Sequence, residues 1–133
     1  MAVDELRKSD MMSHLMEAMD RGEDVGHYGR LVFTMVARYF MDKEDVLKHL
    51  EKSPDFSKED AERMYDEVSA HGYNPPKRDR VLEWQSQQDF EICPSPDDPD
   101  SCNVYKDLRF PDEVYESIAE YFEQKQEASE QAG

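Results

Sequence analysis

Long apolar stretches are missing from this chain of 133 residues. No apolar run approaches the roughly 20 residues of a membrane span, and the N-terminus MAVDELRKSD lacks the apolar core of a signal peptide. These absences argue against a membrane protein and predict a cytoplasmic one. The length is enough for one small domain with a single modest core.

Cysteine is scarce as well, and both cysteines lie in the stretch EICPSPDDPDSC, as Cys93 and Cys102. In a reducing cytoplasm a disulfide between them is not the default, so metal binding is the first alternative. A complete zinc or iron–sulfur site requires four ligands, or three and an open position. His27 or His71 could complete a zinc site, although neither lies at short ligand spacing to a cysteine.

Positive charge is the third shortage. Acidic residues outnumber basic ones 32 to 16, which gives a formal net charge of -16 and a pI near 4.5. Such a charge repels nucleic acid and anionic membranes unless basic residues gather locally. Because the acidic excess runs along the whole chain, we expect a halophilic protein. At high salt, counterion release contributes little to phosphate binding, so a DNA-binding protein tolerates a poor overall charge there.

The apolar residues recur with helical spacing, and no alternating run indicates a strand. We expect an all-α fold, an irregular bundle of five or six helices with one long structured loop at 89–111. Apolar residues surround most of the helix expected from His27 to Met41, which should therefore be central and buried. The expected organisation is a flexible N-terminus at 1–8, a helical domain at 9–123 and a disordered acidic tail at 124–133.

Local signals mark several helix ends. Ser9 and Asp42 are expected to cap helices, and Ser57 with Asp60 resembles a capping box. Gly72 should stop the helix that Ser57 opens, and Pro76 suits the first position of the next one.

A narrow polar stripe interrupts the central helix. His27, Arg30, Thr34 and Arg38 follow three- and four-residue spacing and share one face. Free N–H groups at the helix start favour an anion beside His27. The functional interpretation is a phosphate or nucleotide contact by His27 and Arg30. The alternative is a solvated helix edge on which each arginine pairs with a carboxylate.

The densest positive charge lies in PPKRDR, which holds Lys77, Arg78 and Arg80. Cations at a helix start oppose the helix dipole, a cost that a binding role would explain, whereas the alternative is ordinary surface charge. Trp84 and the tyrosines could stack bases, or they pack in the core.

Catalytic motifs are absent. The sequence contains no dinucleotide or phosphate loop, no HExxH and no nucleophile elbow. No set of residues supplies a nucleophile, a base and an orienting group together, so no enzyme is expected.

Five short motifs occur in an order that resembles a known family. MDRGEDVGHYGRLVFTMVARYF, DVLKHLEKSPDFSKEDAERMYDEV, GYNPP, ICP and CNVY are similar to the C-terminal domain of the archaeal and eukaryotic DNA primase large subunit. The similarity spans roughly Met11 to Ile118. It implies an all-helical domain that carries a [4Fe-4S] cluster, binds template and initiating nucleotide, and assists a separate catalytic subunit.

The resemblance assigns roles to particular residues. His27 and Arg30 match the family's histidine-x-x-arginine, which contacts nucleic acid and nucleotide phosphate, and Tyr65 matches a tyrosine near the DNA surface. Cys93 and Cys102 match the third and fourth cluster cysteines.

The first two cluster cysteines have no counterpart. Met11 or Met12 stands where the first is expected, and Lys77 follows the prolines where the second is expected. We therefore expect the cluster to be lost and a weak zinc site, a redox-labile thiol pair or a packed loop to remain.

The resulting functional hypothesis is a non-catalytic accessory domain for primer synthesis. His27, Arg30 and Arg38 would bind phosphate, Lys77, Arg78 and Arg80 would guide the strand, and Tyr65 would stack. Expected partners are DNA or an RNA–DNA primer-template and a primase catalytic subunit or replication protein. The alternatives are a protein-interaction adaptor that has lost nucleic-acid binding and a small metal- or redox-sensing protein.

Overall fold

Helices make up all the regular secondary structure between residues 2 and 118, the part of the chain that the computed structural model describes. In chain order they are α1 (Ala2–Leu6), α2 (Asp10–Asp20), α3 (Gly26–Ala37), α4 (Lys43–Leu50), α5 (Lys58–His71), α6 (Arg78–Gln85), α7 (Val104–Asp107) and a helical stretch at 112–118. The predicted all-α fold and irregular bundle are confirmed. The tail predicted to be disordered, 124–133, lies outside the described residues.

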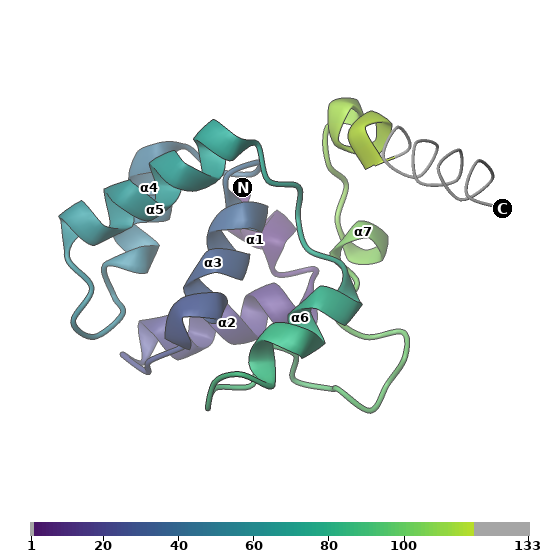
Figure 1. Cartoon of the computed structure of the whole chain (residues 1–133), viewed down its shortest axis with the longest axis horizontal. Coiled ribbons are helices and arrows are strands. Elements are labelled where there is room, and N and C mark those ends of the chain that lie inside the picture. Colours follow the sequence, from purple (N-terminus) through teal and green to yellow (C-terminus); the bar gives the residue numbers. More distant parts are fainter. Residues whose placement is uncertain (1, 119–133) are drawn as a thin grey trace, which may run out of the picture.

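α3 is the central helix, as predicted. Val32, Phe33 and Val36 on it are fully buried. α2, α4, α5 and α6 all contact α3, and Figure 1 shows it in the middle of the molecule with α4 and α5 on one side and α6 on the other. The helix ends at Ala37 rather than Met41, because the chain turns after Arg38.

α2 closes the core on another side of α3 with a face made largely of methionine. Met11, Met12, Met16 and Met19 are at most 1% exposed. Unbranched methionine side chains adapt to irregular gaps between helices. This face is one reason that helices of unequal length pack without a regular bundle geometry.

The predicted helix caps are confirmed. The Ser9 hydroxyl accepts from the N–H of Met12, and the Asp42 carboxylate accepts from the N–H of Asp45. Ser57 and Asp60 form a capping box, and Gly72 ends α5 in the left-handed conformation at a φ of 62°. A glycine adopts this conformation without steric cost.

The chain leaves Gly72 in an extended segment at 73–77, named here the strap. Pro75 and Pro76 in the strap are buried, and α6 begins only at Arg78, with Lys77 as its N-cap. The helix predicted to start at Pro76 thus starts later, because both prolines are used to pack the strap.

Two short helices depart from the sequence predictions. Residues 1–8 were predicted to be flexible, but α1 forms at Ala2–Leu6 and Leu6 is fully buried. α7 interrupts the segment 89–111, which was predicted to be irregular, and it buries Val104. In both cases burial against the rest of the molecule orders a segment that has little local helical signal. No helix of the described residues is long and apolar enough to cross a membrane.

Candidate functional site: a groove between α3, α5 and α6

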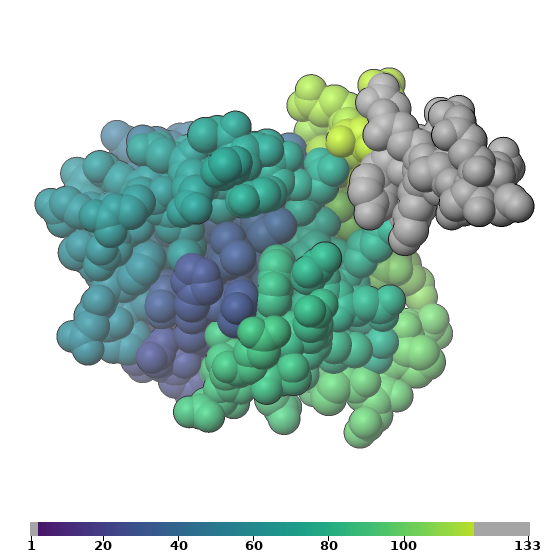
Figure 2. Space-filling model, viewed as in Figure 1, coloured from purple at the N-terminus to yellow at the C-terminus, as the bar shows by residue number. Residues whose placement is uncertain are grey.

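Three adjoining hollows lie where α3, α5, α6 and the strap meet. The first, named here the inner pocket, has a volume of about 300 Å³. It is lined by His27, Leu31, Met35, Met64, Glu67, Val68, Tyr73 and Trp84. In Figure 2 the dark blue atoms of α3 lie between the teal atoms of α5 and the green atoms of α6. Because most of the lining is apolar, the inner pocket suits an apolar or aromatic group.

The second hollow, the outer groove, has a volume of about 760 Å³ and shares Met35, Tyr73 and Trp84 with the inner pocket. The third, the side pocket, has a volume of about 500 Å³ and shares Lys77, Asp79, Tyr105 and Ile118 with the outer groove. The shared residues make the three hollows one continuous surface among residues 2–118.

His27 lies at one end of this surface, as part of the predicted site. It is exposed in the first turn of α3 and lines the inner pocket. Leu31 and Met35 follow at four-residue spacing on the same face of α3 and form the apolar floor beyond it. The imidazole therefore brings a polar group to the edge of an apolar pocket.

Lys77 and Arg80 lie at the other end, in the outer groove, and Lys77 and Arg78 line the side pocket. Nη1 of Arg80 lies 3.7 Å from the Glu83 carboxylate, and both side chains are 60% exposed. Exposed ion pairs of this kind contribute little to the free energy of folding. The structure thus brings Lys77 and Arg80 onto the same continuous surface as His27.

Trp84 lies between these two ends and lines both the inner pocket and the outer groove. Its ring stacks on Tyr28, with the ring centres 5.5 Å apart and the planes at 11°. The Tyr28 hydroxyl donates to Oε1 of Gln87 at 3.3 Å. These contacts hold the indole at a fixed orientation beside the groove.

The strap is held by two side chains from distant segments. Nη2 of Arg38 donates to the carbonyl of Tyr73 at 3.1 Å, and the Tyr105 hydroxyl donates to the carbonyl of Pro75. Burial, with smaller contributions from Tyr39 and Tyr115, raises the pKa of Tyr105 to about 12. The hydroxyl is therefore protonated, and able to donate, at neutral pH.

Arg38 differs from its predicted role. Its guanidinium donates to the Tyr39 hydroxyl at 2.6 Å as well as to the strap, and lies 4.3 Å from the centre of the Tyr39 ring. These contacts leave it facing the protein, so it positions Tyr73 rather than lining the groove.

Arg30 also departs from its predicted role. Nη1 of Arg30 lies 3.1 Å from the Asp24 carboxylate, the side chain is 15% exposed, and the guanidinium lies 4.6 Å from the centre of the Phe56 ring. His27 and Arg30 are thus not joined in one site. The alternative interpretation, an arginine paired with a carboxylate, describes Arg30 correctly.

Tyr65 lies on α5, outside the linings of the three hollows. Its ring is half-buried against the core, and Nζ of Lys43 lies 5.6 Å from the ring centre. The predicted stacking residue is therefore not part of the groove.

Cys93 and Cys102 are joined in a disulfide, so the alternative of a weak zinc site at these two thiols does not apply. The bond differs from the expectation that a cytoplasmic chain keeps its thiols reduced. Both residues are buried, at 0% and 3% exposure. The chain packs Ile92 and Val104 into the core, which brings the two cysteines together from either side of the intervening loop.

The residues do not fit the cluster that the family resemblance implies. A [4Fe-4S] cluster requires four thiolate ligands, whereas this chain has two cysteines and they are bonded to each other. Among residues 2–118 no group of three or more histidine, cysteine, aspartate or glutamate side chains is placed to hold a metal ion.

Tyr73 was expected only as one of several tyrosines that could stack bases, and at 44% exposure it is the large apolar side chain that lies exposed among residues 2–118. Its signal was its place directly after a helix-ending glycine and before two prolines, a setting that presents a side chain on an extended segment. Met35 was read as core, although it lines the floor of two hollows.

Comparison with protein-family models, with curated proteins and with solved structures finds no match for this chain. The similarity to the primase large subunit therefore stays a prediction from the short motifs.

Proposed function

We propose that this chain is a non-catalytic module that binds a short stretch of single-stranded nucleic acid in the groove between α3, α5 and α6. The observation that carries the proposal is the direct connection between an apolar pocket that holds aromatic side chains and a groove that holds two cations. Tyr73 and Trp84 line both hollows, and Lys77 and Arg80 line the outer one. A base would enter the inner pocket while the adjoining phosphates face the cations.

Charge supports this assignment. In a chain with a net charge of -16, the outer groove is lined by two cations, Lys77 and Arg80, and two anions, Asp79 and Glu83. Among residues 2–118 the charges that line the groove thus balance, while the chain as a whole is strongly acidic. A polyanion meets less repulsion here than elsewhere, and high salt reduces the remaining repulsion further.

The chain's single tryptophan supplies the test. We expect an oligonucleotide of about ten nucleotides to quench Trp84 fluorescence in a saturable way, because bases that stack near the indole alter its emission. Lys77→Ala and Arg80→Ala should each weaken binding and flatten its salt dependence. His27→Ala should weaken binding without changing the salt dependence by as much.

Arg63→Ala is the matched control for Arg80→Ala. Arg63 forms an exposed pair with the acid three residues away, Asp60, at 3.5 Å, much as Arg80 does with Glu83, but Arg63 lies outside the groove linings. Equal losses in the two variants would mean that general charge, rather than the groove, attracts the oligonucleotide. Absence of saturable quenching would overturn the proposal.

A second candidate is a protein-interaction adaptor. The inner pocket is lined by Leu31, Met35, Met64 and Val68, with Glu67 on its wall, which suits an apolar side chain from a cationic amphipathic helix. The same fluorescence titration with such a peptide distinguishes the two functions. Quenching by the peptide and none by the oligonucleotide would favour the adaptor.

The place in replication follows from the family resemblance alone. If the oligonucleotide binds, a primer-template junction and a primase catalytic subunit are the partners that the resemblance proposes. Co-sedimentation of the purified chain with such a subunit, with and without primer-template, tests that step separately from the groove itself.

A further inference from the structure

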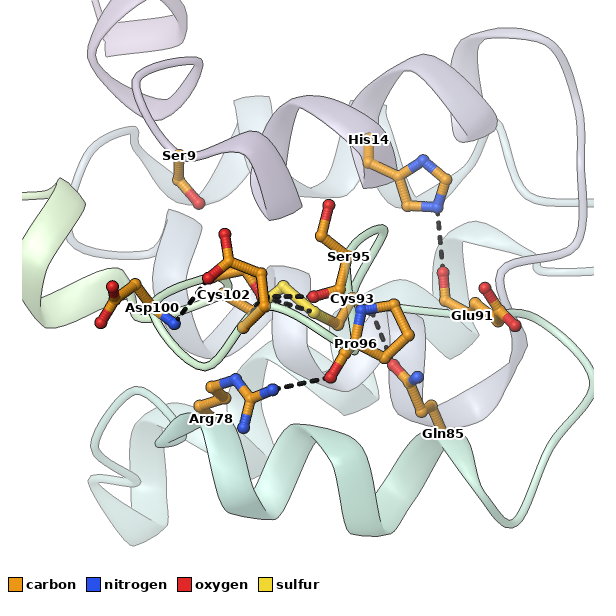
Figure 3. The surroundings of a disulfide bond; sticks show 12 residues. Ser9, His14, Arg78, Gln85, Glu91, Cys93, Ser95, Pro96, Asp100 and Cys102 are labelled. Atoms are coloured by element: carbon orange, nitrogen blue, oxygen red, sulfur yellow. Dashed lines mark hydrogen bonds between the residues drawn. A yellow bond between two sulfur atoms is a disulfide. The ribbon is translucent and has the colours of Figure 1, made fainter.

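The Cys93–Cys102 disulfide anchors an exposed loop to a buried core. The cysteine loop, residues 94–101, is mostly exposed, while the two cysteines that enclose it are buried. Figure 3 shows the disulfide below α2 and above α6, with the loop extending from it. The bond thus joins the two ends of a segment that packs little surface of its own.

Inside the loop, hydrogen bonds depend on the ends being held together. The Ser101 hydroxyl donates to the carbonyls of Ser95 and Asp98. The N–H of Asp100 donates to the carboxylate of Asp98 at 3.0 Å. All of these contacts are local, so nothing in this set ties the cysteine loop to another element.

The loop and its flanking residue contact α6 at both ends of that helix. Nη2 of Arg78, the first residue of α6, donates to the carbonyl of Pro96 at 2.8 Å. Oε1 of Gln85, the last residue of α6, accepts from the N–H of Cys93 at 2.7 Å. Figure 3 shows both bonds. The position of α6 is therefore coupled to the shape of the cysteine loop.

The same segment forms part of the binding surface. Pro99 in the loop and Asn103 after it line the side pocket together with Lys77 and Arg78. α6 itself carries Arg80 and Trp84. A change in the cysteine loop can therefore alter the side pocket directly and the outer groove through α6.

The backbone at Cys102 favours such a change. Its φ is 58°, in the left-handed region, which costs a side-chain-bearing residue roughly 1–2 kcal/mol. In this conformation Cys102 is bonded to Cys93. Once the bond is broken, the backbone is expected to relax to an ordinary conformation and to carry the end of the loop with it.

We propose that the Cys93–Cys102 disulfide is a redox latch: its reduction by a dithiol releases the cysteine loop from α6 and thereby weakens ligand binding in the groove. The binding half of this proposal rests on the proposed function, whereas the release of α6 does not. Disulfides in reducing compartments are usually transient or redox-sensing, so a latch of this kind suits a cytoplasmic protein.

The chemistry of the latch is thiol–disulfide exchange. A thiolate of the dithiol attacks one sulfur, the Cys93–Cys102 bond breaks, and a mixed disulfide forms. The second thiolate of the dithiol then attacks the mixed disulfide, so the dithiol becomes a disulfide and both cysteines leave as thiols. Two electrons and two protons pass to the protein. Because both cysteines are buried, the reaction requires the loop to open first and should be slow.

Hydrogen exchange measured by mass spectrometry tests the release without any ligand. We expect dithiothreitol to accelerate exchange both in the segment 92–103 and in the segment 76–86 that contains α6. In both segments the double variant Cys93→Ser/Cys102→Ser should exchange as fast as the reduced wild type, and dithiothreitol should not change its exchange rates. The variant therefore controls for effects of dithiothreitol itself. Acceleration confined to 92–103 would overturn the latch.

Arg78→Ala tests the route. In the oxidised protein this variant should accelerate exchange in α6 but not in the cysteine loop, and subsequent reduction should add less in α6 than it does in the wild type. If reduction adds as much in α6 of Arg78→Ala as in the wild type, Arg78 is not the coupling residue and the proposed route is wrong.

The ligand measurement is Trp84 fluorescence with the oligonucleotide, on oxidised and reduced protein. We expect reduction to raise the Kd by about fivefold or more, within the usual range of coupling between two sites. Equal Kd values would overturn the effect of the latch on binding. Absence of binding in both forms would contradict the proposed function only, since the exchange experiment still decides whether α6 is released.

Discussion

Gln88 caps the first turn of α3 from 60 residues away: its Oε1 accepts from the N–H of Tyr28 at 3.1 Å. The N-cap residue of α3, Val25, makes no side-chain cap bond, so the distant carboxamide replaces the missing local cap. Nε2 of Gln88 also donates to the carbonyls of Val25 and Phe90. One side chain thus joins the start of α3 to the segment after α6.

Gln88→Ala should therefore lower the free energy of unfolding by about 1–3 kcal/mol, because it leaves one donor and two acceptors without their partner. Gln87→Ala is the matched control, since the Gln87 side chain bonds only at the surface, to the Tyr28 hydroxyl at 3.3 Å and to the Glu83 carbonyl at 3.5 Å, among residues 2–118. Urea unfolding of both variants checks this. Equal losses would mean that the cap contributes no stability of its own.

Gly26→Ala should be more destabilising than Gly72→Ala. Both glycines have a positive φ, 77° and 62°, which costs alanine about 1 kcal/mol. A Cβ at Gly26 would in addition lie 2.4 Å from Oε1 of Gln88, whereas a Cβ at Gly72 would meet nothing within 4 Å. The midpoint of urea unfolding measures the difference.

The Gln88→Ala background isolates the clash. There, Gly26→Ala should cost no more than Gly72→Ala, because the atoms that the added Cβ would meet are gone. A penalty that persists in the double variant would assign the whole effect to the backbone conformation.

Arg30→Ala should lower the free energy of unfolding and leave oligonucleotide binding unchanged. The variant loses an ion pair with Asp24 and the contact with the Phe56 ring, together worth about 1 kcal/mol in a partly exposed setting. Urea unfolding and the Trp84 titration measure the two properties. A weakened Kd at full stability would restore Arg30 to the binding site.

His49 should make the protein less stable as the pH falls. Burial lowers the pKa of His49 below its ordinary value of 6.5; Lys52 lowers it further, and Asp20 and Asp45 act in the opposite direction. Between the folded and the ordinary pKa the unfolded chain binds more protons than the folded chain, so stability rises with pH there and is fully present above it. Below that window the full cost of protonating the half-buried ring remains.

The measurement is urea unfolding at about pH 7.5 and about pH 5.5, on either side of the ordinary histidine pKa. The wild type should lose stability at the lower pH, and His49→Gln should lose less. Identical losses in the two proteins would assign the pH dependence to other groups.

Salt should stabilise the chain. Even if each of the 16 basic residues paired with one acid, 16 of the 32 acidic residues would remain without a basic partner (32 minus 16). Screening of the mutual repulsion should raise the urea midpoint as KCl increases from about 0.1 M to about 2 M. Sucrose at matched osmolality is the control, and equal gains from both would exclude repulsion as the cause.

The sequence predicts best what is decided locally. The caps at Ser9, Asp42 and Ser57 follow from the bond between a side-chain oxygen and an N–H a few residues later, and Gly72 from its left-handed φ. The apolar circumference of α3 likewise predicts its burial without knowledge of its neighbours.

What the sequence does not predict is decided by residues far apart in the chain. The Tyr28–Gln88 cap joins positions 60 residues apart. Arg30 was predicted to bind a ligand because its spacing matches that of His27, but Asp24 and Phe56 determine where it lies. The disulfide was placed second to metal binding because of the expected compartment, an argument that carries no geometric information about the loop.

Burial of the methionine face of α2 protects its thioether sulfurs from peroxide while the protein is folded. Oxidation converts a thioether into a polar sulfoxide that the core cannot accommodate, but Met11, Met12, Met16 and Met19 are sealed from solvent. An oxidant can therefore reach these sulfurs only during the brief intervals in which α2 separates from its neighbours. A sulfoxide on this face would prevent α2 from packing against the core again. The amount of methionine sulfoxide in this chain should therefore increase with the number of times that α2 has transiently separated.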